Sequence, residues 1–496
     1  MTDSEKQGVK SECLGGYYLT ISLICTAYLR MGQSTDIRIE QFSLEFLPVE
    51  TRIPLKFGAE VLTSVTCARV GVEVSNQGGD HAFGWGETPL SVQWVWPSEL
   101  AYSIRQLALI EFCKILSVRW NSFGGYGHCL ELGHRLVMED LPKALADRNS
   151  SDQSGNEPMP WLAALVCASA FDLAVHDAYG VINRVATYQA YGPEFLSSDL
   201  SCYLKPALNS EVCFSNRYPS DFLVLDPPNR LPVWHLVGGL DPLCEDELSG
   251  DEPKDGYPVH LREWIERDGL NCLKIKLRGD DSDWDIRRLV RVGRLSVELG
   301  VEHLSADFNC TVTDPAYVND ILDKLERDFF ETHRRILYIE QPFPHDLTKH
   351  PIEVHSVSER KPLFMDESAH DWKRVVLGRE LGWTGVALKT CKTQTGALLS
   401  LCWAKAHEMD LMVQDLTNPR LAQIPHVLLG VHAGTIMGVE SNAMQFYPGA
   451  SVREARVHPG LFSRKKGELD RSSLRGPGFG YRMEEIARSD QSNQMR

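Results

Sequence analysis

Eight short apolar runs, separated by amphipathic helical stretches, follow residue 200 and constrain the fold more than any other feature of the chain. The runs are PVWHLV, CLKIKL, HLSADFN, ILYIEQP, PLFMDES, GVALKT, LMVQDL and IMGVESN. Such strand–helix alternation predicts parallel strands joined by crossover helices, and eight units in about 250 residues are typical of a TIM-type (β/α) barrel. An open doubly wound sheet is the alternative, but no Gly-rich phosphate turn follows the first strand.

The first 200 residues have a different pattern and predict an α+β domain. Residues 37–87 alternate between apolar and polar positions as strands do, and GGDHAFGWGE is typical of a Gly-rich turn. Residues 98–116 and 160–179 have helical apolar spacing. We expect Gly180 to end the second of these helices.

Charge and cysteine usage narrow the class of protein. A net charge of −16 disfavours a nucleic-acid partner, because a phosphate backbone needs a basic surface. The thirteen cysteines include no Cys-x-x-Cys pair, so we expect reduced thiols in a cytoplasmic protein. Apolar stretches fall short of the ~20 residues needed to span a bilayer, so we expect no membrane contact. Met31 precedes the first convincing strand, which suggests a disordered extension over residues 1–34.

Charged and amide side chains stand at the ends of five successive runs. These residues are Lys274, Lys276, Asp307, Asn309, Glu340, Asp366 and Lys389. The two pairs that are two residues apart share one strand face each. The steps from Asp307 to Glu340, then to Asp366 and then to Lys389 are 33, 26 and 23 residues, each close to one βα unit. Since barrel active sites form at the C-terminal ends of the strands, we expect these groups at one mouth.

The three carboxylates of this set predict a metal site. A lone Asp at a strand end is more often a helix N-cap, so the prediction rests on the joint pattern. Buried carboxylates and lysines without a common ligand would leave uncompensated charge. Asp307, Glu340 and Asp366 suit Mg²⁺, with Mn²⁺ as an alternative, whereas zinc is disfavoured because the set contains no His or Cys.

Taken in order, Lys-x-Lys, Asp-x-Asn, Glu-Gln-Pro, Asp-Glu-Ser and a final Lys resemble the enolase superfamily. Within it they resemble the subgroup of muconate lactonizing enzyme (muconate cycloisomerase) and the dipeptide epimerases. The likeness spans roughly residues 35–482. RIPLKFG and GWGETPL resemble the capping-domain loop and turn of that family, and PGFGYRMEE resembles its C-terminal return strand.

The resemblance implies a role for each matching residue. Asp307, Glu340 and Asp366 would bind Mg²⁺, and Lys276 and Lys389 would be acid/base groups facing each other across the substrate. Further polar residues would assist: Lys274 by holding the substrate carboxylate, and Asn309 and Glu367 as groups beside the site. Lys389 directly follows its apolar run and therefore matches the motif better than Lys392 does.

The resemblance also implies the domain organisation. After the extension of residues 1–34, we expect an α+β capping domain over 35–200 and the modified, enolase-like (β/α) barrel over 201–447. Residues 448–496 would return to the capping domain and end in a polar tail.

The implied reaction is removal of a proton α to a carboxylate, with an enediolate intermediate stabilised by the metal and an ammonium group. Two bases on opposite faces permit racemisation or epimerisation. One base with an internal acceptor or leaving group gives cycloisomerisation or a syn-dehydration of the o-succinylbenzoate synthase type. The substrate would be a small-molecule carboxylate, and a homo-oligomer stays open. Two other classes are a Schiff-base aldolase using Lys276 or Lys389 and an inactive barrel that serves as a binding module.

Two departures narrow the subgroup. The mandelate-racemase branch uses a His after the seventh strand and an Asp after the sixth, where this chain has Gln414-Asp415 and Lys389. Dipeptide epimerases carry an Asp-x-Asp pair after the eighth strand, where this chain has Glu440-Ser-Asn442. Glu440 either helps to bind the amino group of the substrate, as that pair does, or is simply a polar residue at the end of the strand. The choice of substrate would also depend on the loop around Arg52 to Phe57.

Overall fold

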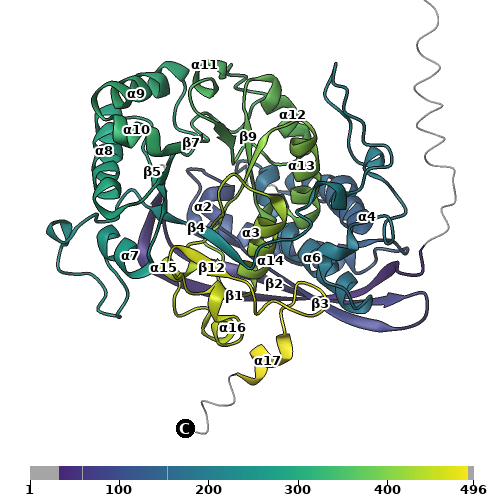
Figure 1. The fold of residues 1–496 in the computed structure, drawn as a ribbon. Helices are drawn as coiled ribbons and strands as arrows, with labels where there is room; N and C mark the ends of the chain where they lie inside the picture. Colours follow the sequence, from purple (N-terminus) through teal and green to yellow (C-terminus); the bar gives the residue numbers. More distant parts are fainter. Residues whose placement is uncertain (1–32, 58–59, 153–154, 490–496) are drawn as a thin grey trace, which may run out of the picture.

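A computed structural model describes residues 33–57, 60–152 and 155–489. An antiparallel sheet with helices comes first, and a parallel barrel follows (Figure 1). The predicted extension over residues 1–34 falls almost wholly outside the described residues.

The N-terminal sheet has the order β1-β2-β3, with β1 (Ile37–Phe57), β2 (Glu60–Asn76) and β3 (His81–Pro89) all antiparallel. RIPLKFG was predicted to be a loop, and this is wrong. Its residues from Arg52 to Phe57 continue β1, with Leu55 opposite Leu62 and Phe57 opposite Glu60. The pairing shifts register between Glu50 and Leu55, and Leu55 is buried.

The turn predicted at GWGETPL is also a strand, because its glycines serve close approach rather than turning. A Cβ on Gly84 would lie 2.3 Å from the Ala178 nitrogen, and one on Gly86 would lie 2.1 Å from the Ala170 carbonyl oxygen. Both contacts are with a helix that packs directly on β3. Because glycine has no side chain, the helix and the strand can pack in direct contact. In the sequence, glycines that allow this packing look the same as glycines that form a turn.

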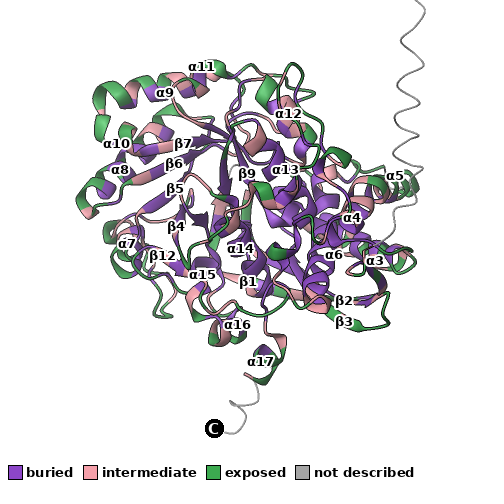
Figure 2. Cartoon of the chain, turned by 45° about the vertical axis from the view of Figure 1, so that its right-hand side comes forward, coloured by how far each residue is buried: buried purple, intermediate pink, exposed green. Residues whose placement is uncertain are grey.

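Five helices follow the sheet: α2 (Val92–Val95), α3 (Tyr102–Trp120), α4 (Cys129–His134), α5 (Leu141–Ser151) and α6 (Trp161–Ile182). By length and composition α6 is apolar enough to cross a membrane, yet 89% of its most apolar window is buried inside the protein (Figure 2). Gly180 does not end α6. A Cβ there would lie 2.7 Å from the Gly478 Cα, so this glycine admits the C-terminal segment.

The second part is the predicted barrel of eight parallel strands. They are β4 (Arg230–Val237), β5 (Cys272–Lys276), β6 (His303–Asp307), β7 (Ile336–Glu340), β8 (Leu363–Met365), β9 (Gly385–Leu388), β10 (Asp410–Val413) and β11 (Val439–Glu440). Their order is β10-β9-β8-β7-β6-β5-β4-β11, and β12 (Glu468–Asp470) adds antiparallel to β4. The ends approach each other, since Ile436 before β11 donates its N–H to the Leu411 carbonyl in β10 (2.9 Å). The prediction of a capped TIM-type barrel is confirmed.

Helices surround the barrel (Figure 1). They are α7 (Leu261–Asp268), α8 (Ser282–Leu299), α9 (Pro315–Asp328), α10 (Phe330–Arg335), α11 (His355–Ser358), α12 (Trp372–Glu380), α13 (Gln394–Ala406) and α14 (Gln423–Ala433). Three short helices follow: α15 (Ala443–Phe446), α16 (Val452–Val457) and α17 (Met483–Arg488). The longest crossover, α8, is bounded by Asp281, whose side chain accepts the Trp284 N–H, and by Gly300 in the left-handed region (φ 76°).

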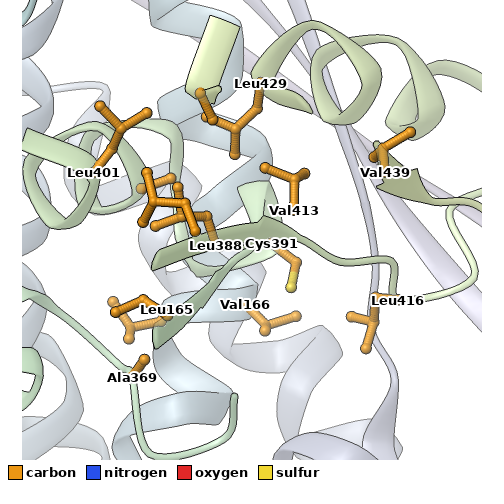
Figure 3. Packing of buried hydrophobic residues seen from close by; sticks show 14 of the residues in the cluster. Leu165, Val166, Ala369, Leu388, Cys391, Leu401, Val413, Leu416, Leu429 and Val439 are labelled. Atoms are coloured by element: carbon orange, nitrogen blue, oxygen red, sulfur yellow. The ribbon is translucent and has the colours of Figure 1, made fainter. Parts of the chain in front are cut away.

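One apolar core joins the two parts. Leu165 and Val166 of α6 belong to the same buried cluster as Leu388 of β9 and Leu416 after β10 (Figure 3). The helix of the first domain therefore supports the barrel strands whose ends carry the predicted site.

The C-terminal segment contacts α6, where Phe479 donates its N–H to the Asp177 carboxylate (2.7 Å). A return strand was predicted at PGFGYRMEE, and this is wrong. Gly478 and Gly480 have φ of 68° and 73°, outside the β region, and only an isolated bridge from Gly478 to Ala186 forms there among the described residues. The domain boundaries themselves stay predictions.

Candidate active site

Strand register brings the predicted residues of β5, β6 and β7 together. Lys276 is the register partner of Asp307, and Asp307 is the partner of Glu340. Register partners in neighbouring strands are about 5 Å apart, so these three groups form a row across the barrel mouth. Asp366 directly follows β8 and Lys389 directly follows β9, which extends the row around the mouth.

Two lysines of β5 engage the acids of β6 and β7. Lys274 Nζ lies 2.5 Å from Glu340 Oε1, 3.2 Å from Asp307 Oδ2 and 3.1 Å from Glu440 Oε2. Lys276 Nζ donates to Asp307 Oδ2 at 2.5 Å. The spacing of Lys-x-Lys thus places both ammonium groups on the same carboxylate, as the shared strand face predicted.

A second cluster forms on the other side of the mouth. Lys389 Nζ lies 3.1 Å from Asp366 Oδ2 and donates to the Asp415 carbonyl at 2.8 Å. Lys392 Nζ lies 3.2 Å from Asp366 Oδ1 and donates to the Asp366 carbonyl at 2.5 Å. Asp366 therefore has a lysine on each carboxylate oxygen.

Charge pairing sets the protonation of these groups. Burial alone would lower the pKa of Lys274, but Glu340, Glu440 and Asp307 raise it well above its usual value. Burial likewise opposes the net upward shift in the pKa of Lys389, which Asp366 causes. Burial and the neighbouring Asp307 carboxylate raise the pKa of Glu340. Lys274 and Lys389 are therefore held as ammonium ions in this arrangement.

The two lysine clusters face one small cavity of about 40 Å³. Lys274, Lys276 and Lys389 all line it, whereas Lys392 does not line it. This geometry agrees with the preference for Lys389 over Lys392 as the second acid/base group. Its roof comes from the N-terminal domain and includes Leu55, Phe57, Leu62, Ser91 and Trp94. Of the segment expected to influence substrate choice, Leu55 and Phe57 reach the cavity, while Arg52 instead binds Asp255 (2.7 Å).

Trp94 is a site residue that sequence reasoning missed. Its indole N–H donates to Glu367 Oε1 (2.9 Å), and its ring lies 5.1 Å from Lys389 Nζ and 5.7 Å from Lys392 Nζ. A tryptophan on a four-residue helix gives no periodic or motif signal, so only the fold reveals it. Asn309 lies beside the same carboxylate, with Nδ2 3.5 Å from Glu367 Oε1. Glu367 and Asn309 thus flank the site, as expected.

The three residues at which this chain departs from the subgroup motifs, Gln414, Asp415 and Glu440, also lie at the barrel mouth. Gln414 donates from Nε2 to Glu340 Oε2 at 2.5 Å, so it orients a predicted metal ligand. Asp415 accepts the backbone N–H groups of Asn418 (2.7 Å) and Asn442 (2.6 Å) and shapes the two loops. Glu440 ends β11, pairs with Lys274, accepts from Asn442 Nδ2 (2.8 Å) and lines the cavity.

The chemistry of the donor set fits a hard divalent cation. The buried cluster contains the lysines and carboxylates Lys274, Lys276, Lys389, Lys392, Asp307, Glu340, Asp366, Glu367, Asp415 and Glu440. It therefore carries more acids than amines, and the oxygens are of the kind that Mg²⁺ prefers. As the side chains lie, lysines occupy the carboxylates, and no three His, Cys, Asp or Glu groups of the described residues converge as a metal cage. The assignment of Asp307, Glu340 and Asp366 as ligands stays a prediction.

One family model matches the C-terminal half of the chain. Residues 257–487 match the family model described as enolase C-terminal domain-like. The match includes the barrel strands from β5 to β11. It confirms the resemblance of this part of the chain to the enolase superfamily. A search of curated protein sequences found no match.

Solved structures share the fold over most of the chain. The L-Ala-D/L-Glu epimerase from Bacillus subtilis is 17% identical, with a TM-score of 0.57 over 89% of this chain and 98% of that one. A dipeptide epimerase from Enterococcus faecalis V583, complexed with Mg and L-Leu-L-Tyr, is 14% identical, with a TM-score of 0.58 over 89% and 99%. The 2-chloromuconate cycloisomerase from Rhodococcus opacus 1CP is 15% identical, with a TM-score of 0.54 over 91% and 99%. At these low identities, the TM-scores establish a shared fold only.

Proposed function

We propose that this chain is an enzyme that removes and returns the proton α to a substrate carboxylate, giving racemisation or epimerisation. The family match over residues 257–487 supports the general class, and the similar structures include epimerases and a cycloisomerase. One observation carries the proposal. Lys276 at the end of β5 and Lys389 directly after β9 line the same cavity, and each is paired with a different carboxylate.

The two lysines have complementary tasks. Lys389 is held protonated by Asp366 and can deliver a proton to one face of the α-carbon. Lys276 stands across the cavity and would take the proton from the other face. Lys274, held as an ammonium ion, would bind the substrate carboxylate and stabilise the charge of the enediolate.

A cation would take carboxylate oxygens that the lysines occupy in this arrangement. Asp307, Glu340 and Asp366 would hold Mg²⁺, with Gln414 orienting Glu340. When bound, the ion would supply positive charge for the negative oxygens of the enediolate. The roof of Leu55, Phe57 and Trp94 would exclude water from the α-carbon and so prolong the charged intermediate.

Hydrogen exchange tests the proposal most directly. The protein is incubated in D₂O with Mg²⁺ and pooled N-acyl amino acids, dipeptides and unsaturated diacids, and α-deuteration is followed by mass spectrometry. We expect exchange in at least one compound class. Complete absence of exchange would contradict the proposal.

The same experiment separates the alternatives. Inversion at the α-carbon accompanying exchange, followed as loss of rotation for an N-acyl amino acid and as a new diastereomer for a dipeptide, indicates racemisation or epimerisation. A lactone or a dehydrated product indicates cycloisomerisation or syn-dehydration. A Schiff-base aldolase would be trapped covalently on a lysine by borohydride, and we expect no such adduct. A binding module would hold a carboxylate without exchanging its proton.

A further inference from the structure

A second and larger cavity, of about 460 Å³, lies beside the lysine-lined cavity. The two share Phe57 and Trp94 as walls. Both parts of the chain contribute to the larger cavity, with Trp96 and Glu157 from the N-terminal domain and Glu367 from the barrel. A substrate anchored at the lysines would therefore have room for a substituent of considerable size next to them.

The two cavities differ in charge. The small one is lined by three lysines together with Asp366, Asp415 and Glu440, whereas the described residues that line the large one include Glu60, Glu157 and Glu367 and no Lys or Arg. Its two histidines add no positive charge, because burial lowers the pKa of His345 and lowers that of His370 to about 3. Arg105 Nη1 lies 3.8 Å from Glu60 Oε1 and compensates only that carboxylate.

Buried acceptor atoms in the wall lack donors. Glu367 is 6% exposed, and its Oε1 accepts from Trp94. Apart from the weakly donating Cys310 thiol beside this carboxylate, the described residues offer no hydrogen-bond partner to its Oε2, and they offer none to the neighbouring Asn309 Oδ1. A buried acceptor without a donor is unfavourable, and two of them in one cavity wall indicate a ligand that brings donors. The indoles of Trp94 and Trp96 add flat faces suited to a cation.

We propose that this cavity binds the far end of the substrate and that this end carries an ammonium or guanidinium group. The inference rests on the proposed function and gives it a substrate class: a carboxylate whose α-substituent ends in a cation. The substrate would lie with its negative end at Lys274 and its positive end at Glu367, Glu60 and Glu157. This arrangement matches the charges of both ends and also rejects substituents that are themselves acidic.

The test compares two nearly isosteric ligands. N-acetyl-L-arginine and N-acetyl-L-citrulline differ at the far end, where a guanidinium replaces a neutral urea. The α-exchange rate in D₂O with Mg²⁺ gives kcat/KM for each, and calorimetry gives each Kd independently of chemistry. We expect the arginine compound to be favoured by at least about tenfold in both, since a hydrogen bond to a buried charged group is worth about that factor or more.

Variants connect this preference to the cavity. Glu157→Gln and Glu60→Gln should each lower the arginine-to-citrulline ratio by about threefold, a modest factor because Glu157 is exposed and Glu60 is partly exposed. The matched control Glu211→Gln removes an exposed acid outside the cavity lining and should leave the ratio unchanged. Equal Kd values for the two ligands, or no measurable binding of either, would overturn the inference.

The two proposals fail separately. Exchange without a preference for the cationic ligand would refute the cavity inference and keep the enzymatic function. Tighter binding of N-acetyl-L-arginine without exchange of any carboxylate would refute the function and keep the cationic site.

Discussion

Trp94 of the N-terminal domain donates its indole N–H to Glu367 at the mouth of the barrel, at 2.9 Å. The same ring lies 5.1 Å from Lys389 Nζ, so one side chain of the roof contacts both a buried acid and a proposed acid/base group. The N-terminal domain therefore shapes the chemistry of the site as well as covering it.

Replacing Trp94 separates these two contacts. Trp94→Phe keeps an aromatic face for Lys389 but removes the donor to Glu367, which leaves a buried acceptor unsatisfied and should cost about 1–3 kcal/mol in the free energy of unfolding. Trp94→Leu removes both contacts and should lower kcat further than Trp94→Phe does. Urea denaturation and α-exchange kinetics measure the two effects. Equal kcat values for both variants would show that the aromatic face has no role in positioning Lys389.

Each acid/base lysine should be essential for one stereoisomer. Lys276→Ala and Lys389→Ala should each reduce α-exchange of one isomer by about 10²–10⁴-fold, because each removes the group that handles the proton on one face. The exposed Lys349→Ala is the control and should exchange both isomers at the normal rate. Circular dichroism verifies folding. Unchanged rates in either site variant would refute the assignment of that base.

Metal dependence follows from the three predicted ligands. Chelation should reduce exchange to background, and added Mg²⁺ should restore it. Asp307→Asn, Glu340→Gln and Asp366→Asn should each abolish Mg²⁺ binding measured by calorimetry. They should also destabilise the fold by about 3–5 kcal/mol, since each breaks a buried ion pair with a lysine. Exchange that survives exhaustive chelation would contradict the metal assignment.

Asp177 should make stability depend on pH. Burial raises its pKa from 3.8 to about 7, although it accepts the N–H groups of Phe479 and Trp85. The folded state then binds a proton that the unfolded state has lost, so the contribution of Asp177 to stability falls as the pH rises from about 4 to 7.

The variant Asp177→Asn lacks this titration. Its free energy of unfolding relative to wild type should therefore rise by roughly 2–3 kcal/mol between pH 5 and pH 7, as measured by urea denaturation. Glu245→Gln, which changes an exposed acid, should instead run parallel to wild type. Parallel curves for Asp177→Asn as well would show that Asp177 is ionised in the folded protein throughout this range.

Close contact between β3 and α6 should make Gly86 intolerant of any side chain. Gly86→Ala would place a Cβ 2.1 Å from the Ala170 carbonyl oxygen, both of them in packed backbone, and should cost about 3 kcal/mol or more. Gly449→Ala has open space around the new Cβ and should change stability by less than about 0.5 kcal/mol. Thermal unfolding compares the two. A Gly86→Ala protein as stable as wild type would show that α6 can move away from the sheet.

The sequence by itself determined the barrel and the row of charged strand ends. Strand–helix alternation is a local periodic property, and Asp307, Glu340 and Lys389 each follow an apolar run directly, so their positions around the mouth follow from chain order alone. Tertiary structure decided everything that depends on contacts between distant segments. Gly84 and Gly86 lie in a strand, and a side chain at either position would clash with α6. A glycine needed for such close packing looks the same in the sequence as a glycine needed for a turn. Trp94 and the glutamates of the large cavity meet the barrel only through folding, because no local pattern records which side chains from separate elements will share one space.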